Sequence, residues 1–410
     1  MDFGMFEVED MVHDEQATST IIKVIGVGGA GGNAVNRMIA SGLKKVHFVT
    51  MNTDMQALQR SNAQTRLPIG RELTGGLGAG GVPDVGEKAA QESKDEIRRE
   101  VENADMVFIT AGMGGGTGTG AAPIVAEVAK SCNALTVAVV TTPFAFEGKK
   151  KLVLAQAGIE KLRKQVDTLI IIPNQYLLKV VENNTPIKQA FLMADEVLYM
   201  GVQGISELIT EPGEINIDFA DVRTVMKGKG DALMGIGFGE GANRAVDAAR
   251  QAVSNPLLES ASIEGAKSVL INLAGSDNLT LQEYQDVVEL VTEQCAEDAL
   301  IIAGQAFNPE LGDRIKVTVV ATGFDRREVV GAESDEHEAA RRRFGISEPA
   351  AGAERESVPQ ESGEDIAAIQ VNRWQDLQKQ LGKSANPAST DYSIPAVLRY
   401  SRGKGGDEGQ

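Results

Sequence analysis

The segment Gly114–Gly120, with the sequence Gly-Gly-Gly-Thr-Gly-Thr-Gly, constrains the fold more than any other feature of this chain. It lies between an apolar run that predicts a strand, Met106–Thr110, and a predicted helix, Ala121–Cys132. Glycine at this density carries a large entropic penalty on folding, so we expect a ligand to need it. Backbone N–H groups beside hydroxyls suit a di- or triphosphate. Because the lysine of the G-x-x-x-x-G-K-[ST] pattern is missing, the segment is not a P-loop.

A second glycine segment, Gly26–Gly31, matches G-x-G-x-x-G. It follows a β-branched run that begins at Ile21, and it precedes a predicted helix, Asn33–Ser41, with Gly42 as the expected C-cap. Asp54 lies about 20 residues further on, where dinucleotide-binding folds keep a ribose-binding acid. Taken alone, this motif leaves open an NAD-dependent oxidoreductase or a plain tight turn.

Strands that alternate with helices predict an α/β fold: a doubly wound, mainly parallel nucleotide-binding sheet covered on both faces. A long apolar helix from Pro186 to Ile209 stops before Pro212 and would join this sheet to a second, smaller mixed α/β domain. The other expected strands are Val46–Thr50, Leu135–Thr141, Leu169–Ile172, Ala232–Phe238, Ser268–Ala274, Ala299–Phe307 and Ile315–Ala321. The other expected helices are Met55–Arg60, Pro83–Asn103, a Lys-rich helix before Leu169, Ala242–Ser254 and Leu281–Cys295.

Composition changes along the chain predict its domain limits. We expect a flexible arm at 1–20, a nucleotide-binding domain at 21–185, a central helix at 186–211 and a C-terminal α/β domain at 212–323. Residues 324–390 are rich in Glu, Arg, Ala, Ser and Gln, which is typical of a disordered linker. The stretch Asp391–Arg399 regains apolar character, which indicates either a partner-binding peptide or chance composition. A variable tail at 400–410 follows.

The formal net charge of -18 opposes direct binding of nucleic acid or of an anionic membrane surface. The first 20 residues lack the pattern of a signal peptide, and no apolar run approaches the roughly 18 residues of a spanning helix. We therefore expect no direct membrane insertion. Cys132 and Cys295 stand apart without partner motifs, so we expect neither a disulfide nor a zinc site. We expect the protein to reside in a reducing compartment and both cysteines to serve in packing.

The run GGGTGTG resembles the signature loop of the tubulin/FtsZ GTPase family. GVGGAGGNAVNRM, NTDMQAL, GLGAGG, TTPFAFEGKK, FADVRTVM and VTVVATG resemble further segments of that family in the expected order, over about residues 20–323. DYSIPAVLR resembles its C-terminal peptide. The resemblance implies GTP and GDP as ligands, Mg²⁺ as cofactor, a head-to-tail homopolymer and a cytoplasmic location at the mid-cell division ring. The residues Asp391 to Arg399 would then dock on division proteins, including a membrane tether such as FtsA.

The resemblance also assigns roles in the nucleotide site. The residues expected around the phosphates are Gly29, Ala30, Gly31, Gly32, Asn33, Gly116, Thr117 and Gly118. Ala79 and Gly80 would sense the γ-phosphate, Glu147 would bind the ribose, and Phe191 would stack on the base. Asp195, assisted by Asn174, would accept hydrogen bonds from the base. This chemistry favours guanine, whose N1–H and 2-amino group both donate.

No catalytic residue is evident among these nucleotide-site residues, and no Ser-His or Cys-His pairing is suggested. The resemblance implies that Asn216, Asp218 and Asp221 form a catalytic loop acting on the GTP of a neighbouring subunit. Asp218 and Asp221 also fit a helix N-terminus, where acids are favourable. No protein cage for a metal ion is expected, since Mg²⁺ binds largely through phosphate and water.

One position departs from the family pattern: Lys151 stands where the family usually has arginine four residues after the ribose glutamate. Lysine keeps the charge but cannot make a forked contact with phosphate. A GTP-binding scaffold that does not hydrolyse GTP is therefore an alternative to the GTPase.

Overall fold

The structure is a computed structural model that describes residues 20–178, 185–211, 213–254 and 263–324. The expected arm before residue 20, the linker from 325 onward, the peptide at 391–399 and the tail at 400–410 lie outside the described residues.

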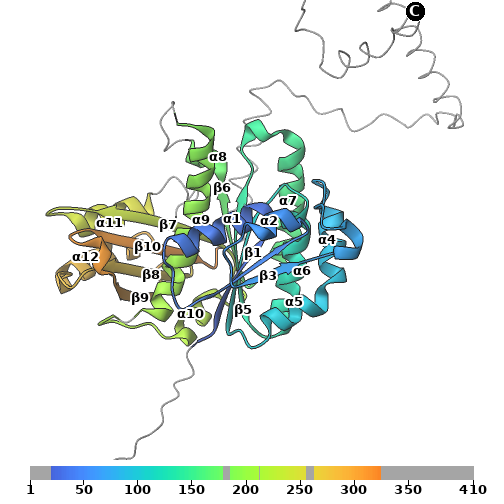
Figure 1. The fold of residues 1–410 in the computed structure, drawn as a ribbon. Helices are drawn as coiled ribbons and strands as arrows, with labels where there is room; N and C mark the ends of the chain where they lie inside the picture. The colour runs from blue at the N-terminus through green and yellow to red at the C-terminus, as the bar shows by residue number, and fades with distance from the viewer. Residues whose placement is uncertain (1–19, 179–184, 212, 255–262, 325–410) are drawn as a thin grey trace, which may run out of the picture. The chain divides into compact units, whose positions relative to one another are not determined.

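Within the described residues, ten strands form one sheet in the order β3-β2-β1-β4-β5-β6-β7-β10-β8-β9 (Figure 1). Neighbouring strands from β3 to β7 are parallel, β10 is antiparallel to both β7 and β8, and β9 is parallel to β8. The strands are β1 Ile22–Val27, β2 His47–Asn52, β3 Thr65–Pro68, β4 Met106–Gly112, β5 Leu135–Thr142, β6 Thr168–Pro173, β7 Gly230–Gly239, β8 Ser268–Gly275, β9 Leu300–Phe307 and β10 Ile315–Thr322. The predicted mainly parallel, doubly wound α/β fold is confirmed.

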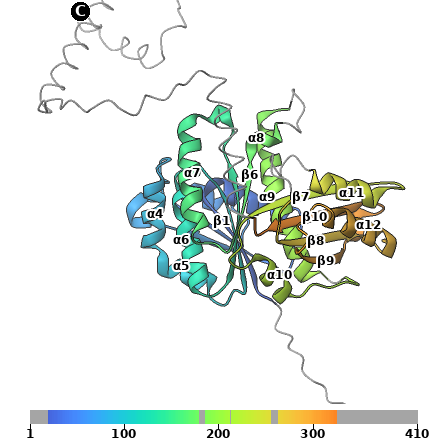
Figure 2. The same ribbon diagram turned by 180° about the vertical axis from the view of Figure 1, so that it is seen from behind.

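Alternate residues of the parallel strands enter two different cores. In β4, Met106 and Phe108 join one cluster while Val107 and Ile109 join the other, because successive side chains of a strand point to opposite faces. The helices of the first face include α1 Gly28–Ala40 and α9 Ile187–Thr210, and those of the second include α5 Lys94–Val101, α6 Thr117–Ser131 and α7 Lys149–Arg163. Figures 1 and 2 show these layers on either side of the strands.

Helix α9 links the two halves of the sheet. Its side chains Val202 and Ile205 are fully buried in a cluster that also holds Met234 of β7 and Leu270 of β8. On the other face of this second half, a third cluster lies under α11 Arg244–Val253 and α12 Leu281–Thr292. The expected central helix and smaller α/β half are therefore present.

Both glycine segments enter helices earlier than expected. Helix α1 begins at Gly28 rather than at Asn33, and α6 begins at Thr117 rather than at Ala121. Glycine has a low helix propensity, which biased the prediction toward loops. Tertiary packing requires glycine at such a position in spite of this low propensity. A Cβ on Gly31 would lie 2.3 Å from the carbonyl oxygen of Thr110.

The helix expected over Pro83–Asn103 is two helices, α4 Pro83–Glu92 and α5. They are separated at Ser93, whose Oγ accepts a hydrogen bond from the N–H of Gly70 at 3.1 Å. The strand β3 and the short helix α3, Arg71–Thr74, were not predicted. The hydrogen bond between Gly70 and Ser93 is a tertiary contact, which leaves no periodic signal in the sequence.

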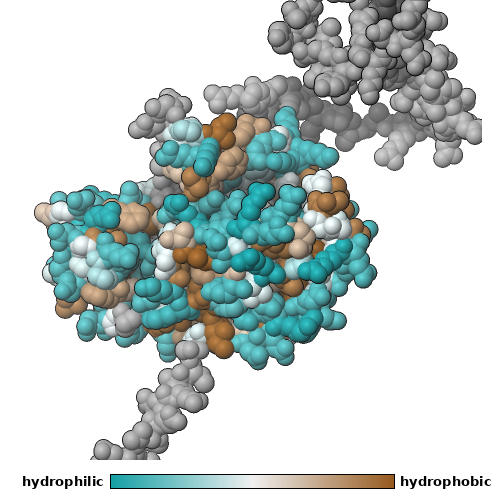
Figure 3. All heavy atoms as spheres, viewed as in Figure 1, coloured by the Kyte–Doolittle hydropathy of each residue, from teal (hydrophilic) through white to brown (hydrophobic). Residues whose placement is uncertain are grey.

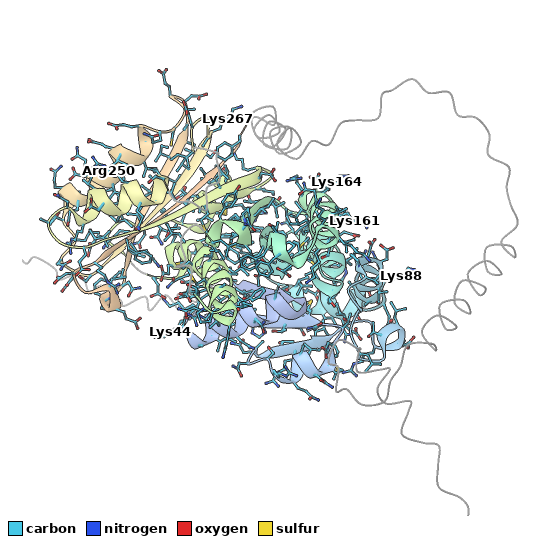
Figure 4. All side chains as sticks on the ribbon, turned by 90° about the horizontal axis from the view of Figure 1, so that it is seen from above. Lys44, Lys88, Lys161, Lys164, Arg250 and Lys267 are labelled. Carbon is cyan, nitrogen blue, oxygen red and sulfur yellow. The ribbon has the colours of Figure 1, made fainter. Side chains whose placement is uncertain are left out.

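The surface in Figure 3 is mainly hydrophilic, with several small groups of apolar side chains, one of them at its upper end near α8 Asn174–Leu177 and the start of α9. Figure 4 labels Lys161 on α7, where its Nζ lies 2.7 Å from Glu87 of α4. Over the part of the chain that the structure describes, none of the helices combines the length and the apolar character needed to cross a bilayer.

Candidate nucleotide-binding site

A cavity of about 280 Å³ lies where the N-terminal ends of α1 and α6 meet the ends of β4 and β5. Side chains from α7, α8 and α9 close its other side. The predicted residues that line it are Gly29, Ala30, Gly116, Thr117, Gly118, Glu147, Lys151, Asn174, Phe191 and Asp195. Residues far apart in the sequence therefore share one cavity, although their individual contacts with a nucleotide stay predictions.

Two helix N-termini form the end of the cavity that suits phosphates. The first N–H groups of a helix have no partner within it, and the helix dipole places positive charge there. Gly28 has φ 74°, and a Cβ at this position would lie 2.8 Å from the nitrogen of Gly118. Only glycine permits this approach of α1 to α6. Gly29 has no atom within 4 Å of its Cβ position, so its surroundings are open.

The residues Gly31, Gly32 and Asn33 do not line the cavity. Gly31 and Gly32 are on the buried side of α1, and the Cβ position of Gly32 lies 3.2 Å from Cγ2 of Thr50. Asn33 is exposed. The structure gives Gly31 and Gly32 a packing role, and their expected phosphate contacts stay predictions.

The loop with Ala79 and Gly80 lies beside the phosphate end. A Cβ on Gly116 would lie 2.8 Å from Cβ of Ala79, so the two segments are in close contact. Ala79 is buried, whereas Gly80 is exposed with φ 58°. This loop contacts the glycine segment of α6 without lining the cavity.

The opposite end of the cavity has the side chains suited to a base. Phe191 of α9 makes an edge contact with Phe144 at 5.4 Å between ring centroids. The Oδ1 atom of Asn174 is buried and has no hydrogen-bond partner. A buried acceptor without a partner destabilises the protein, so this atom is suited to a donor from a ligand.

Asp195 lines the same end of the cavity from α9. Burial raises the pKa of its carboxyl group to about 6, and the positive charge of Arg37 on α1 opposes that rise. The Nε of Arg37 donates to Glu196 at 2.7 Å, which ties α1 to α9 beside the carboxylate. Arg37 was not predicted, because neither its motif nor its spacing distinguishes it from a surface cation.

Glu147 and Lys151 lie one helical turn apart, and their Oε2 and Nζ atoms are 2.9 Å from each other. Oε1 of Glu147 also accepts a hydrogen bond from the N–H of Phe144 at 3.0 Å. The glutamate is therefore held from two sides, whereas half of the Lys151 side chain is exposed. Lysine at this position has room to turn toward a phosphate.

Asn216, Asp218 and Asp221 lie outside this cavity, after the C-terminal end of α9. Asp218 caps α10 Phe219–Met226 by accepting a hydrogen bond from the N–H of Asp221 at 2.8 Å. Asp54 is also elsewhere: its carboxylate caps α2 Met55–Gln59 through the N–H groups of Gln56 and Ala57. The ribose role considered for Asp54 thus has no support in the geometry.

Comparison with known proteins agrees with this arrangement. Residues 21–182 match the Tubulin/FtsZ family GTPase domain, and residues 230–325 match the FtsZ family C-terminal domain. A structure of an FtsZ dimer from M. jannaschii, described as empty, is 47% identical, with a TM-score of 0.72 over 75% of this chain and 89% of that chain.

Two more distant structures share the fold. CetZ1 from Haloferax volcanii, a GDP-bound monomer, is 22% identical, with a TM-score of 0.65 over 75% of this chain and 95% of that chain. CetZ2 from the same organism, a GTPγS-bound protofilament, is 21% identical, with a TM-score of 0.64 over 80% of this chain and 100% of that chain. Since both family domains are matched in order and the M. jannaschii structure is similar over most of its length, the chain belongs to the FtsZ family of cytoskeletal GTPases.

Proposed function

We propose that this chain hydrolyses GTP in head-to-tail filaments, with each active site completed by the loop of the next subunit. The observation that carries this proposal is the separation of the two sets of residues along α9. Asp195 lies at the nucleotide cavity, and the helix continues to Thr210 before the loop with Asn216, Asp218 and Asp221. At 1.5 Å per residue, the end of the helix lies roughly 22 Å from Asp195. The residues of the loop do not line the cavity of their own subunit, which supports their action on the GTP of another subunit.

Recognition of guanine would come from the base end of the cavity. The ionised carboxylate of Asp195 would accept from N1–H and the 2-amino group, and Asn174 Oδ1 is a further buried acceptor. Adenine presents an acceptor at N1, so the same carboxylate would disfavour it. Phe191 would stack on the base, supported from the side by Phe144.

The sugar and phosphates would extend toward the two helix N-termini. Glu147 would accept from the ribose hydroxyls, and Lys151 would place a positive charge near the phosphates. Backbone N–H groups of Gly29, Gly116 and Gly118 would surround the phosphate oxygens. Positioning and electrostatic stabilisation of this kind suffice for phosphoryl transfer.

The loop of the next subunit would supply the groups that act on water. Asp218 and Asp221 are exposed at the start of α10, so both carboxylates are accessible to a second copy. They would orient and polarise the attacking water, and Asn216 would help to place it. Its Oδ1 already accepts from the N–H of Gly213 at 2.8 Å, which holds its side chain against the loop.

Mg²⁺ would be held at this site mainly by the phosphates of bound GTP. Among the described residues, no group of three or more His, Cys, Asp or Glu side chains is placed to hold a metal ion. Mg²⁺ usually keeps several waters and binds through phosphates in such sites, where it neutralises their charge.

A contact that joins two different faces builds an open filament unless its rotation closes a ring, and filaments are the assembly that we propose here. By resemblance, the filaments would scaffold the division septum from the cytoplasm at mid-cell. The segment Asp391–Arg399 would connect them to division proteins, among them a membrane tether such as FtsA.

Phosphate release from GTP, measured against protein concentration with light scattering in parallel, tests the shared site. The rate per subunit should rise above a threshold concentration together with the scattering. A rate per subunit that does not depend on concentration would show that each subunit hydrolyses GTP alone.

A further inference from the structure

The segment that leads into the catalytic loop is bonded to the outer strand of the sheet. The N–H of Gln305 in β9 donates to the carbonyl oxygen of Ile215 at 3.0 Å. The side chain of the same residue accepts, through Oε1, from the N–H of Glu214 at 3.0 Å. Gln305 thus bonds two successive residues of the segment, one with its backbone and one with its side chain.

The neighbouring residues fit closely at the same place. A Cβ on Gly213 would lie 1.9 Å from the carbonyl oxygen of Gln305, so the backbone of the segment touches the strand. One residue earlier in β9, the Cβ position of Gly304 lies 2.6 Å from the buried side chain of Ile217. Strand β9 is the last in the sheet order, so its outer edge is available for this contact.

On one side, the segment faces a cavity instead of packed side chains. This cavity of about 600 Å³ is lined by Gly213, Glu214 and Ile215 together with Gln305 and Phe307. Besides the bonds to β9, the side chain of Asn216 holds the segment by accepting from the N–H of Gly213 at 2.8 Å. Loss of the bond to the N–H of Glu214 would leave the segment held to β9 by the backbone bond to Ile215, so the start of the loop would shift in position without detaching.

We propose that Gln305 is a positioning residue for GTP hydrolysis, because its side chain fixes the segment 213–216 and thereby the loop with Asp218 and Asp221. This inference rests on the proposed function of that loop. It concerns a residue in the C-terminal half, about 90 positions after the loop in the sequence. Small misplacements of reacting groups reduce rates strongly, by up to about 100-fold for 1 Å.

The substitution Gln305→Leu removes the side-chain acceptor and keeps the apolar stem, while the backbone bond to Ile215 persists. We expect the kcat of assembled protein to fall about tenfold, with GTP affinity unchanged, because residue 305 does not line the nucleotide cavity. Gln251→Leu is the matched control. Gln251 also accepts from a backbone N–H, that of Phe238, but it lies on α11 away from the loop. It should retain the wild-type kcat.

Mixing two variants separates positioning from a general defect. Gln305→Leu keeps its nucleotide cavity, and Asp195→Ala keeps its loop. An interface in which the GTP of a Gln305→Leu subunit meets the loop of an Asp195→Ala subunit is therefore complete. The mixture should hydrolyse GTP faster than the sum of the rates of the two variants measured separately. A wild-type kcat for Gln305→Leu, or a mixture that only sums, would overturn the inference. If instead the wild-type rate is independent of concentration, the shared site itself has failed, which is a distinguishable result.

Discussion

Lys316 of β10 and Glu207 of α9 form an ion pair in the interior, with Nζ and Oε2 2.8 Å apart and less than a tenth of either side chain exposed. The other carboxylate oxygen of Glu207 accepts from the amide of Gln203 at 2.7 Å. The pair joins the central helix to the second half of the sheet. It lies near the end of α9 that leads into the catalytic loop.

Lys316→Met should destabilise the protein by about 3–5 kcal/mol, because it leaves the Glu207 carboxylate buried without its cation. Urea unfolding measures the loss. Lys161→Met is the control, since Lys161 pairs with Glu87 at the surface and its loss should change stability by less than about 1 kcal/mol. The double variant Lys316→Met/Glu207→Gln should recover stability, and a double variant as unstable as Lys316→Met would contradict the explanation.

Two glycines of α1 should respond differently to alanine. In Gly31→Ala the new Cβ would meet the Thr110 carbonyl oxygen at 2.3 Å, and a backbone atom cannot move aside. We expect a loss of about 1–3 kcal/mol or more in unfolding free energy. Gly29→Ala meets no atom within 4 Å and should fold normally, but its methyl group borders the cavity. GTP should then bind about tenfold more weakly, which is a loss of about 1.4 kcal/mol in binding free energy. Equal stability losses in the two variants would show that the packing argument is wrong.

Binding of GDP should depend on the ionisation of Asp195. Its pKa is raised to about 6 by burial, so the carboxylate that accepts from guanine is present above pH 6 and is protonated below it. A bound guanine stabilises the ionised form, so the dissociation constant should rise about tenfold per pH unit below pH 6. Calorimetry at pH 5, 6 and 7 measures this change.

The control for this pH dependence is Asp195→Asn, measured at the same pH values. Both proteins share the titration of the GDP phosphate, so the difference between them isolates residue 195. The variant should bind GDP weakly at every pH. Parallel pH profiles for the two proteins would remove Asp195 from base recognition.

The sequence predicted most of the fold because parallel strands are buried on both faces and read as apolar runs, as in Met106–Thr110. It failed where tertiary contacts decide the local structure, as at Ser93, whose bond to Gly70 separates α4 from α5. In the site, family resemblance identified residues that line the cavity, such as Asp195. It could not separate the open Gly29 from the packed Gly31, because that difference depends on which atoms of β4 lie opposite. The pKa of Asp195 was equally out of reach, since it depends on burial.

Asp218 has two roles that substitution can separate. Its carboxylate caps α10 and would also act on water. Asp218→Asn keeps a good N-cap and removes the charge, so stability should be retained while GTP turnover falls about 100-fold or more. Asp218→Ala should lose turnover and also about 1 kcal/mol of stability.

Asp221 is exposed on the first turn of α10, and its side chain does not serve as the N-cap. Asp221→Ala should therefore keep GTP binding and lose less than about 1 kcal/mol of stability, from the helix dipole alone, while losing turnover. Phosphate release from assembled protein, with nucleotide affinity measured separately, gives the answer. Unchanged turnover would exclude Asp221 from the mechanism.

Lys151→Arg tests whether the departure from the family pattern limits activity. A guanidinium at this position can keep the bond to Glu147 one turn away and also fork onto a phosphate, which an ammonium cannot do. We expect turnover to rise severalfold, with thermal stability unchanged because the Lys151 side chain is half exposed. Lys151→Met is the matched loss of charge and should weaken GTP binding about tenfold. An unchanged rate in Lys151→Arg would show that the site accepts either cation.

The same variant tests the alternative of a scaffold that binds GTP without hydrolysing it. If the wild-type protein assembles but releases phosphate only at background, while Lys151→Arg hydrolyses GTP, lysine at this position has converted the chain into such a scaffold.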